Sequence, residues 1–262
     1  MNLTIESVHA RGGAWPRILG VWARQELVLL LREPVAVFFS LAFPTLLYVF
    51  IGIPYGKTEV GPGIRFIDMM FPALIVTAMA NLLLMGLPIY LAELRSRGAD
   101  RRYRILPLPG AIFASSVLLA TLVLVAASAG VIVVVVLLRD GLLPSVLSPG
   151  FIALAFGCLV WLSALGFFVG ALRVSSRTTQ ALSAVLFFAM FFGSGAAAPI
   201  EGLPEILQRV LDWNPLKQWL DVMVGVYTGT EVTQIEYLRL LMAIPIAMIG
   251  IVGGLWLWRR TP

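Results

Sequence analysis

Residues 93 to 109, ELRSRGADRRYRILPLP, are the part of this chain whose residue types and spacing best suit a specific interaction. Charges of both signs fall within about three helical turns, and the stretch then stops at two prolines. A short helix of this kind outside the lipid suits docking against a protein surface, with Tyr103 and Leu106 as apolar anchors. The residues expected to dock are Glu93, Arg95, Arg97, Asp100, Arg101, Arg102, Tyr103 and Arg104. For any single arginine, a topology signal is the alternative interpretation.

Catalytic chemistry has no comparable set of residues in the sequence. The sole histidine, His9, lies in the N-terminal tail, far from any nucleophile or metal ligand in an apolar run. GIPYGKT, residues 52 to 58, looks like a phosphate-binding loop, but Ile51 stands where that pattern needs its first glycine. We therefore expect that the chain is not an enzyme and holds no cofactor or metal of its own.

The composition predicts a membrane protein. Apolar residues make up 60% of the 262 residues and charged residues only 13%, and the mean hydropathy is +0.94. The net charge of +5 does not indicate nucleic-acid binding, because the charges punctuate apolar runs instead of covering a soluble face. Cys158 is the only cysteine, so no intramolecular disulfide can form.

Six uncharged runs are long enough to cross the hydrocarbon as helices, which needs about 20 residues each. These predicted spans one to six cover approximately 35–54, 69–91, 110–137, 150–172, 179–199 and 240–258. Prolines inside four of them are expected to kink or shorten the helices. We expect an all-α polytopic membrane protein with one domain, 1–262. Its parts are a tail with an interfacial helix (1–34), spans one to five (35–199), an outer hairpin (200–235), and span six with a tail (236–262).

The distribution of Lys and Arg predicts the orientation. With the N-terminus inside, one side receives thirteen of the 19 basic residues, and basic residues are retained on the cytoplasmic side. Both termini are therefore expected to be cytoplasmic, and the charged stretch becomes the first cytoplasmic loop.

Two further segments are predicted to be surface helices. Apolar residues recur at helical spacing between Pro16 and Pro34, which favours an amphipathic helix in the membrane interface. The residues assigned to this interfacial helix are Trp22, Arg24, Arg32 and Glu33. The alternative is that span one begins early. After span five, Asn214 can cap a helix whose apolar stripe is Leu216, Trp219, Leu220, Met223 and Val224. That stripe is expected to dip into the outer leaflet and to face spans five and six.

The order of these elements resembles the type-2 ABC exporter permeases, the membrane subunits of multidrug and antibiotic exporters, over residues 17 to 260. The motifs are LLLREP before span one, Gly98 followed at fixed spacing by Pro107, Leu108 and Pro109, and GSGAAAPIEGLP leading to NPL at 214–216. One departure is that family members often have a glutamate close before the loop glycine, where this chain has Ser96 and Arg97.

The resemblance implies a transporter in the cell inner (plasma) membrane. The charged loop would be a coupling helix that docks on a soluble ABC ATPase subunit, present in two copies, and ATP and Mg would be bound by that partner. A second permease, identical or related, would complete the transporter. ATP would drive an amphipathic or lipid-like substrate, such as a drug, antibiotic, lipid or glycolipid, out of the cell.

Roles for individual residues follow from the same resemblance. The stripe residues Leu216, Trp219, Leu220 and Met223 would form an extracellular gate, and Asn81 and Ser194 are candidates for the substrate path. For Asn81 an interhelical hydrogen bond is an equal alternative. Two other classes of protein stay open: a non-transporting membrane scaffold or signalling partner of an ATPase, and, less favoured, a secondary transporter. The spans hold no mid-membrane ionisable residue of the kind that a secondary transporter usually needs.

Overall fold

The computed structural model describes residues 15–32, 34–96, 110–196 and 204–259. Nearly all of them are helical. The α-helices are α1 (Trp15–Leu31), α2 (Pro34–Leu47), α3 (Ile53–Tyr55), α4 (Phe66–Ala80), α5 (Leu87–Ser96), α7 (Gly110–Arg139), α8 (Pro149–Ala171), α9 (Ser176–Gly193), α10 (Glu205–Leu211), α11 (Pro215–Thr228) and α12 (Gln234–Arg259). Two π-helical segments, Tyr48–Gly52 and Asn81–Gly86, join α2 to α3 and α4 to α5, and a 3-10 turn lies at Pro144–Leu147.

Four helical stretches among the described residues are long and apolar enough to cross a bilayer. They are Phe66–Ser96, Phe113–Arg139, Pro149–Ala171 and Gln234–Leu257, and they match predicted spans two, three, four and six. Predicted span one contains a shorter apolar helix, Leu41–Tyr55, and predicted span five corresponds to α9, whose first turns are polar. The expectation of an all-α membrane protein is confirmed in this coarser form.

One small sheet was not expected. Strands β1 (Glu59–Gly61) and β2 (Ile64–Arg65) form an antiparallel hairpin between α3 and α4. Gly63 has a φ of 72°, a left-handed conformation that glycine adopts without a steric penalty. The hairpin reverses the chain after α3 and places Arg65 directly before α4.

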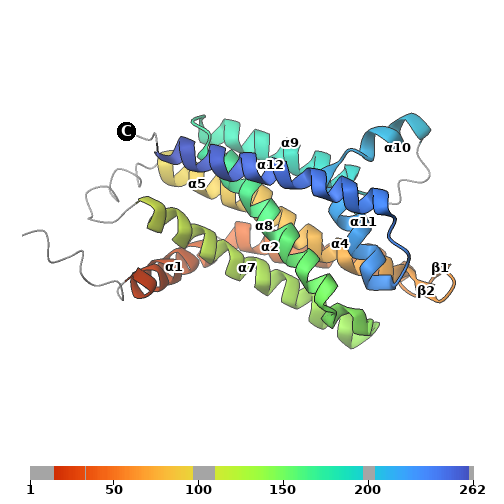
Figure 1. Cartoon of the computed structure of the whole chain (residues 1–262). Coiled ribbons are helices and arrows are strands. Elements are labelled where there is room, and N and C mark those ends of the chain that lie inside the picture. Colours follow the sequence, from red (N-terminus) through yellow and green to blue (C-terminus); the bar gives the residue numbers. More distant parts are fainter. Residues whose placement is uncertain (1–14, 33, 97–109, 197–203, 260–262) are drawn as a thin grey trace, which may run out of the picture.

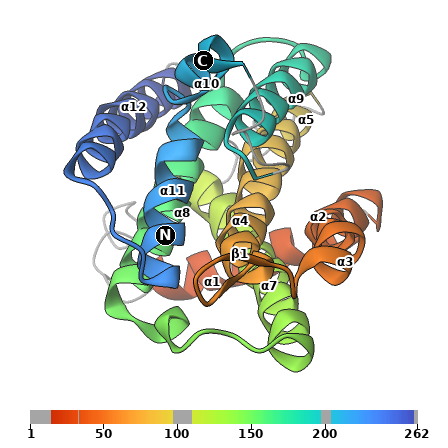
Figure 2. The ribbon, with the colours of Figure 1, turned by 90° about the vertical axis from the view of Figure 1, so that its right-hand side faces the viewer.

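The helices form one bundle with different elements at its two ends. In Figure 1, α1 and the C-terminus lie at one end, while β1, β2 and α10 lie at the other. In the end view, α4 runs through the middle with α2 and α12 on opposite sides (Figure 2). Every residue from Met70 to Ala80 is buried, as expected for a helix that is apolar on all sides.

Glycines on α8 set how closely its neighbours approach. A methyl group on Gly166 would lie 1.9 Å from the carbonyl oxygen of Leu83, and one on Gly170 would lie 2.7 Å from the side chain of Leu91. Further along, Gly157 accommodates the ring of Trp219, which a methyl group would meet at 2.7 Å. Small residues therefore let α8 contact the backbone of span two closely and leave space for a side chain of α11.

Candidate functional site

The C-terminal end of span two leads directly into the predicted docking loop. α5 continues without a break through Glu93 and Arg95 to Ser96, so these two docking residues belong to the helix of span two. Both are partly buried. The other six predicted docking residues, Arg97, Asp100, Arg101, Arg102, Tyr103 and Arg104, lie outside the described residues.

Helix α1 lies beside this end of span two and packs most extensively on α7. Its buried face consists of Ala23, Glu26 and Leu30, at helical spacing. The Glu26 side chain is fully buried and accepts a hydrogen bond of 2.7 Å from the hydroxyl of Tyr90 on α5. This bond fixes α1 to the helix that enters the docking loop.

The apolar residues of α1 lie on more than one face of the helix. Val21, Val28 and Leu29 are exposed, Arg24 and Arg32 are exposed, and Trp22 is half-buried. Glu33 lies outside the described residues. Exposed apolar residues opposite a buried face are compatible with a helix that contacts lipid on one side and protein on the other.

The outer hairpin consists of α10 and α11. As predicted, the side chain of Asn214 caps α11 by accepting a hydrogen bond of 2.9 Å from the Leu216 amide. Pro215 occupies the first turn of the helix, where proline is tolerated. Pro204 precedes α10 and does not lie in its first turn. The Asn214 amide group also donates to the carbonyl of Met190, at 2.9 Å, which attaches the start of α11 to the end of α9.

The apolar stripe of α11 is buried. Leu216, Trp219, Leu220 and Met223 are all less than a tenth exposed, and the Trp219 ring lies against Gly157 of α8. The expected orientation toward spans five and six was only partly right, because α11 packs mainly on α4 and α12, then on α8, and less on α9. The central position of α4 explains the difference: an apolar stripe buries most surface against a helix that is itself apolar on every side.

Charged residues at the start of α11 form a small cluster. Lys217 lies 2.6 Å from Asp221 and 3.2 Å from Asp212, and Asp212 also pairs with Arg239 of α12 at 3.6 Å. Burial raises the pKa of Asp221, although Lys217 opposes the shift. Burial lowers the pKa of Lys217, but its hydrogen bonds to Asp221 and Asp212 outweigh burial, so the pKa is raised overall and the ammonium group stays charged.

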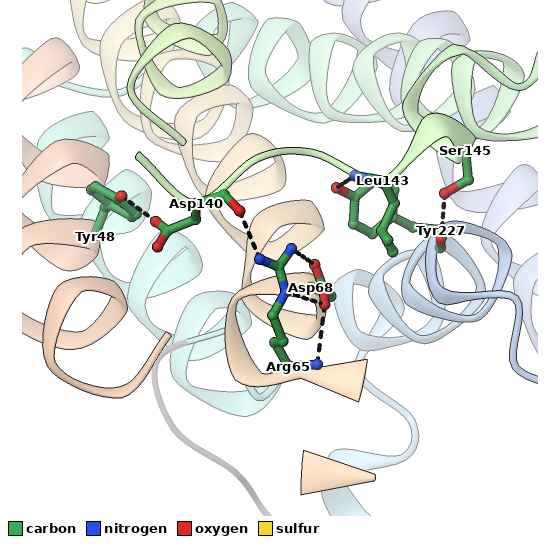
Figure 3. A network of polar contacts seen from close by, with 7 residues as sticks. All are labelled: Tyr48, Arg65, Asp68, Asp140, Leu143, Ser145 and Tyr227. Carbon is green, nitrogen blue, oxygen red and sulfur yellow. Dashed lines mark hydrogen bonds and ion pairs between the residues drawn. The ribbon is translucent and has the colours of Figure 1, made fainter. Parts of the chain in front are cut away.

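A second polar network joins the ends of several helices on the side of the bundle away from the predicted docking loop (Figure 3). Arg65 makes a two-pronged contact with Asp68, with Nη2 to Oδ1 at 2.7 Å and Nε to Oδ2 at 3.0 Å, and its Nη1 donates to the backbone carbonyl of Asp140 at 2.6 Å. Asp140 in turn accepts from the hydroxyl of Tyr48. The hydrogen bonds to Asp68 raise the pKa of Arg65 above its usual range.

The same loop contacts the end of α11. The Leu143 amide donates to the hydroxyl of Tyr227 at 3.1 Å, and the Ser145 hydroxyl donates to the Tyr227 carbonyl (Figure 3). The Tyr227 ring packs on Phe71 and Phe151, with ring centroids 5.1 and 5.3 Å apart. Burial raises the pKa of the Tyr227 phenol, which therefore stays neutral. The segment after α2, the start of α4, the end of α7, the start of α8 and α11 thus form one connected unit.

The two path candidates occupy different structural positions. Asn81 begins the π-helical segment in the middle of span two and is partly buried. Ser194 is buried at the end of α9, where its hydroxyl donates to the Phe191 carbonyl at 2.9 Å and accepts from the Ala196 amide at 3.3 Å. Its hydrogen bonds therefore stabilise the helix end.

Sequence reasoning missed Glu26, Tyr48, Asp140 and Tyr227. Its only available signal was that charged residues gather at predicted span ends, with Arg65 and Asp68 three residues apart before span two. The hydrogen-bond partners of the four missed residues lie far away in the chain, so no local pattern could indicate them.

A comparison with protein-family models finds the ABC-2 type transporter domain over residues 19–228. The chain belongs to the ABC-2 type transporter family. The match covers α1 to the end of α11 and therefore includes both ends of the bundle. No curated protein matches the chain.

Membership of the ABC-2 type transporter family makes the chain a permease component of an ABC transporter and a multi-pass membrane protein. It also implies partnership with an ABC ATPase subunit. The resemblance drawn from the sequence motifs is thereby confirmed at the level of the family.

Proposed function

We propose that this chain is the membrane subunit of an ATP-driven exporter that moves an amphipathic or lipid-like substrate outward. It crosses the membrane six times with both termini in the cytoplasm, and it pairs with a second permease and two ATPase subunits. ATP and Mg are bound by the ATPase, whose closure pushes the loop after α5. The observation that carries the proposal is the ABC-2 family match across almost all the membrane helices.

The arrangement of the two ends supports the proposed orientation of the permease in the membrane. The helix that enters the charged loop lies with α1 at one end of the bundle, and α10 with the β-hairpin lies at the other (Figure 1). The loop is where the basic residues gather, which favours the cytoplasm. The buried stripe of α11 then covers the outer end, in the position of an extracellular gate.

The lining that the spans offer supports an amphipathic substrate. Between Met69 and Ala92 of span two the sequence has no charged residue, and the same holds for residues 110–138 and 149–172. A route among these helices would present apolar side chains with scattered hydroxyl and amide groups. Such a surface suits a molecule with a large apolar part, and does not suit a small hydrophilic ion.

The test of the proposal reverses charge in the loop. Arg101→Glu with Arg102→Glu should release the ATPase or uncouple its ATP hydrolysis from export, because complementary charge at the docking surface is lost. The matched control is Arg17→Glu with Arg24→Glu, which reverses two exposed charges on α1. The measurements are co-purification with the ATPase, ATP hydrolysis in proteoliposomes, and ATP-dependent movement of a fluorescent amphipathic dye.

Three results separate the alternatives. If the loop variant loses coupling and the α1 control variant keeps it, the result supports docking through this loop. Normal co-purification, hydrolysis and dye movement in the loop variant would reduce its arginines to topology signals. ATPase binding by the parent chain with no dye movement for any amphiphile tested would favour the non-transporting scaffold.

A further inference from the structure

The two π-helical segments share a local sequence. Tyr48–Gly52 is followed by Ile53 and Pro54, and Asn81–Gly86 is followed by Leu87 and Pro88. The chain thus reads Gly-Ile-Pro at the end of the first segment and Gly-Leu-Pro at the end of the second. A π-helical segment with a single wide turn is rare and is frequently found at functional sites.

The proline explains the wide turn in both cases. Proline has no N–H, so the carbonyl four residues before it loses its usual donor. In span two, the Leu87 N–H donates to Leu82, five residues back. The Leu83 carbonyl then lacks a donor at both usual positions: the Leu87 N–H is already used, and residue 88 is proline. In span one the Ile53 N–H donates to Tyr48, and Pro54 leaves the Val49 carbonyl in the same condition.

The unused carbonyl of span two faces a glycine on the neighbouring helix. The Leu83 oxygen lies where a methyl group on Gly166 would be only 1.9 Å away. A carbonyl against a glycine Cα makes at most a weak C–H···O contact, which holds the helix in place far less firmly than an N–H···O bond. The helix of span two is therefore weakened between Asn81 and Pro88, where the Leu83 carbonyl has neither of its usual helical donors.

The parts of span two on either side of this segment have different neighbours. α4 packs on α11, α7 and α2, and its first turn is held by the Arg65 and Asp68 contact. α5 packs on α8 and α9, and Tyr90 holds it to α1 through Glu26. The outer half therefore belongs to the polar network of Figure 3, whereas the inner half belongs to the elements around the loop.

We propose that the π-helical segment Asn81–Gly86, together with Pro88, is a bending joint in span two. The joint lets α5 tilt with the loop that follows it while α4 stays fixed to the outer polar network. Gly166 permits the joint because its missing side chain leaves the space that the Leu83 carbonyl occupies. This mobility is a property of the chain itself and does not depend on what the protein transports.

The test measures the length of span two in the full chain in lipid nanodiscs. Spin labels are placed at Met69 and Ser96, both exposed, with Cys158 replaced by Ala, and the distance is measured by pulsed electron resonance. A straight helix between these positions would be about 40 Å long. In the chain without further substitutions, called the parent, we expect a distribution of label-to-label distances that is broad or has two components. Pro88→Ala supplies an N–H and should remove the shorter component.

The matched control is Pro72→Ala, because Pro72 lies in the same span inside an ordinary α-helix. Its distribution should equal that of the parent. An unchanged distribution in Pro88→Ala, or equal narrowing by both substitutions, would overturn the proposal.

A second variant tests the joint without changing a proline. Gly166→Ala should shift the Met69 to Ser96 distance, because the added methyl group displaces the Leu83 carbonyl. Gly150→Ala on the same helix meets only an ordinary contact, the Val226 side chain at 3.4 Å, and should leave the distance unchanged. A folded Gly166→Ala variant with the parent distance would also overturn the proposal. None of these measurements requires the ATPase or a substrate.

Discussion

The hydroxyl of Tyr48 donates a hydrogen bond to the carboxylate of Asp140, 92 residues later in the chain. This bond connects the π-helical segment after α2 to the loop after α7. Arg65 donates a second hydrogen bond to that loop, at the backbone carbonyl of Asp140. Because Tyr48 is fully buried, its hydroxyl has no access to water as an alternative partner. The outer polar network is therefore expected to hold the spans together on that side.

Tyr48→Phe should destabilise the folded chain by roughly 1–3 kcal/mol, because a hydrogen bond to a charged partner is lost while the ring is kept. Tyr55→Phe is the matched control, since Tyr55 is exposed and lies a few residues further on. The measurement is thermal or denaturant unfolding in detergent micelles, followed by the loss of monodisperse protein. Equal stability of the two variants would contradict a role for the Tyr48 bond.

Asp68→Ala should cost roughly 1–3 kcal/mol, because it removes the charged hydrogen-bond partner of the Arg65 guanidinium, and solvent screens the remaining charge since the Arg65 side chain is 33% exposed. The control is Glu205→Ala in the α10 pair with Arg209, whose side chains are 86% and 81% exposed and 3.6 Å apart. An exposed pair of this kind contributes at most about 1 kcal/mol. The same unfolding assay compares them, and a control as destabilised as Asp68→Ala would show that the network has no special weight.

Trp219→Ala should remove anchoring worth roughly 3–5 kcal/mol, because the buried ring fills the space above Gly157. Trp213→Ala serves as the control, since Trp213 is 74% exposed at the end of α10. If α11 is the extracellular gate, Trp219→Ala should also lower ATP-dependent export, or allow leak, per molecule in the membrane. Lower abundance with unchanged export per molecule would give Trp219 a structural role only.

The proposed orientation can be checked with impermeant thiol reagents in intact cells. Cys158 is fully buried and is replaced by Ala to give a cysteine-free chain. Lys57→Cys should then be labelled from outside, whereas Ser96→Cys should react only after the cells are opened. Both positions are exposed on the protein, so a difference reports the side of the membrane. Labelling in the opposite sense would reverse the topology and place the charged loop outside.

Local sequence was sufficient wherever a structural feature depends on neighbouring residues. The apolar runs predict the helices of spans two, three, four and six, because a bilayer-spanning helix satisfies its own backbone hydrogen bonds. The start of α11 was also predictable, since Asn214 and Pro215 act on amides within the next turn. The family resemblance rests on the same kind of short motif.

Tertiary structure decided which distant residues meet. The partners Glu26 and Tyr90 are separated by 64 residues, and Leu143 and Tyr227 by 84. No periodicity encodes such pairs. The buried face of α1 could not be predicted from the sequence for a related reason: in a membrane both faces of a helix can be apolar, so hydropathy does not distinguish lipid from protein.

Span two shows most clearly which features the sequence determines and which the tertiary structure decides. Its sequence determines that Pro88 withholds an N–H, so that some backbone carbonyl must lose its donor. Only the packed structure decides that Leu83 is the residue affected and that its carbonyl faces Gly166 of α8. The physical reason is that a hydrogen-bond deficit is local to one helix, whereas the space that accommodates it is formed by a neighbour 83 positions away in the sequence.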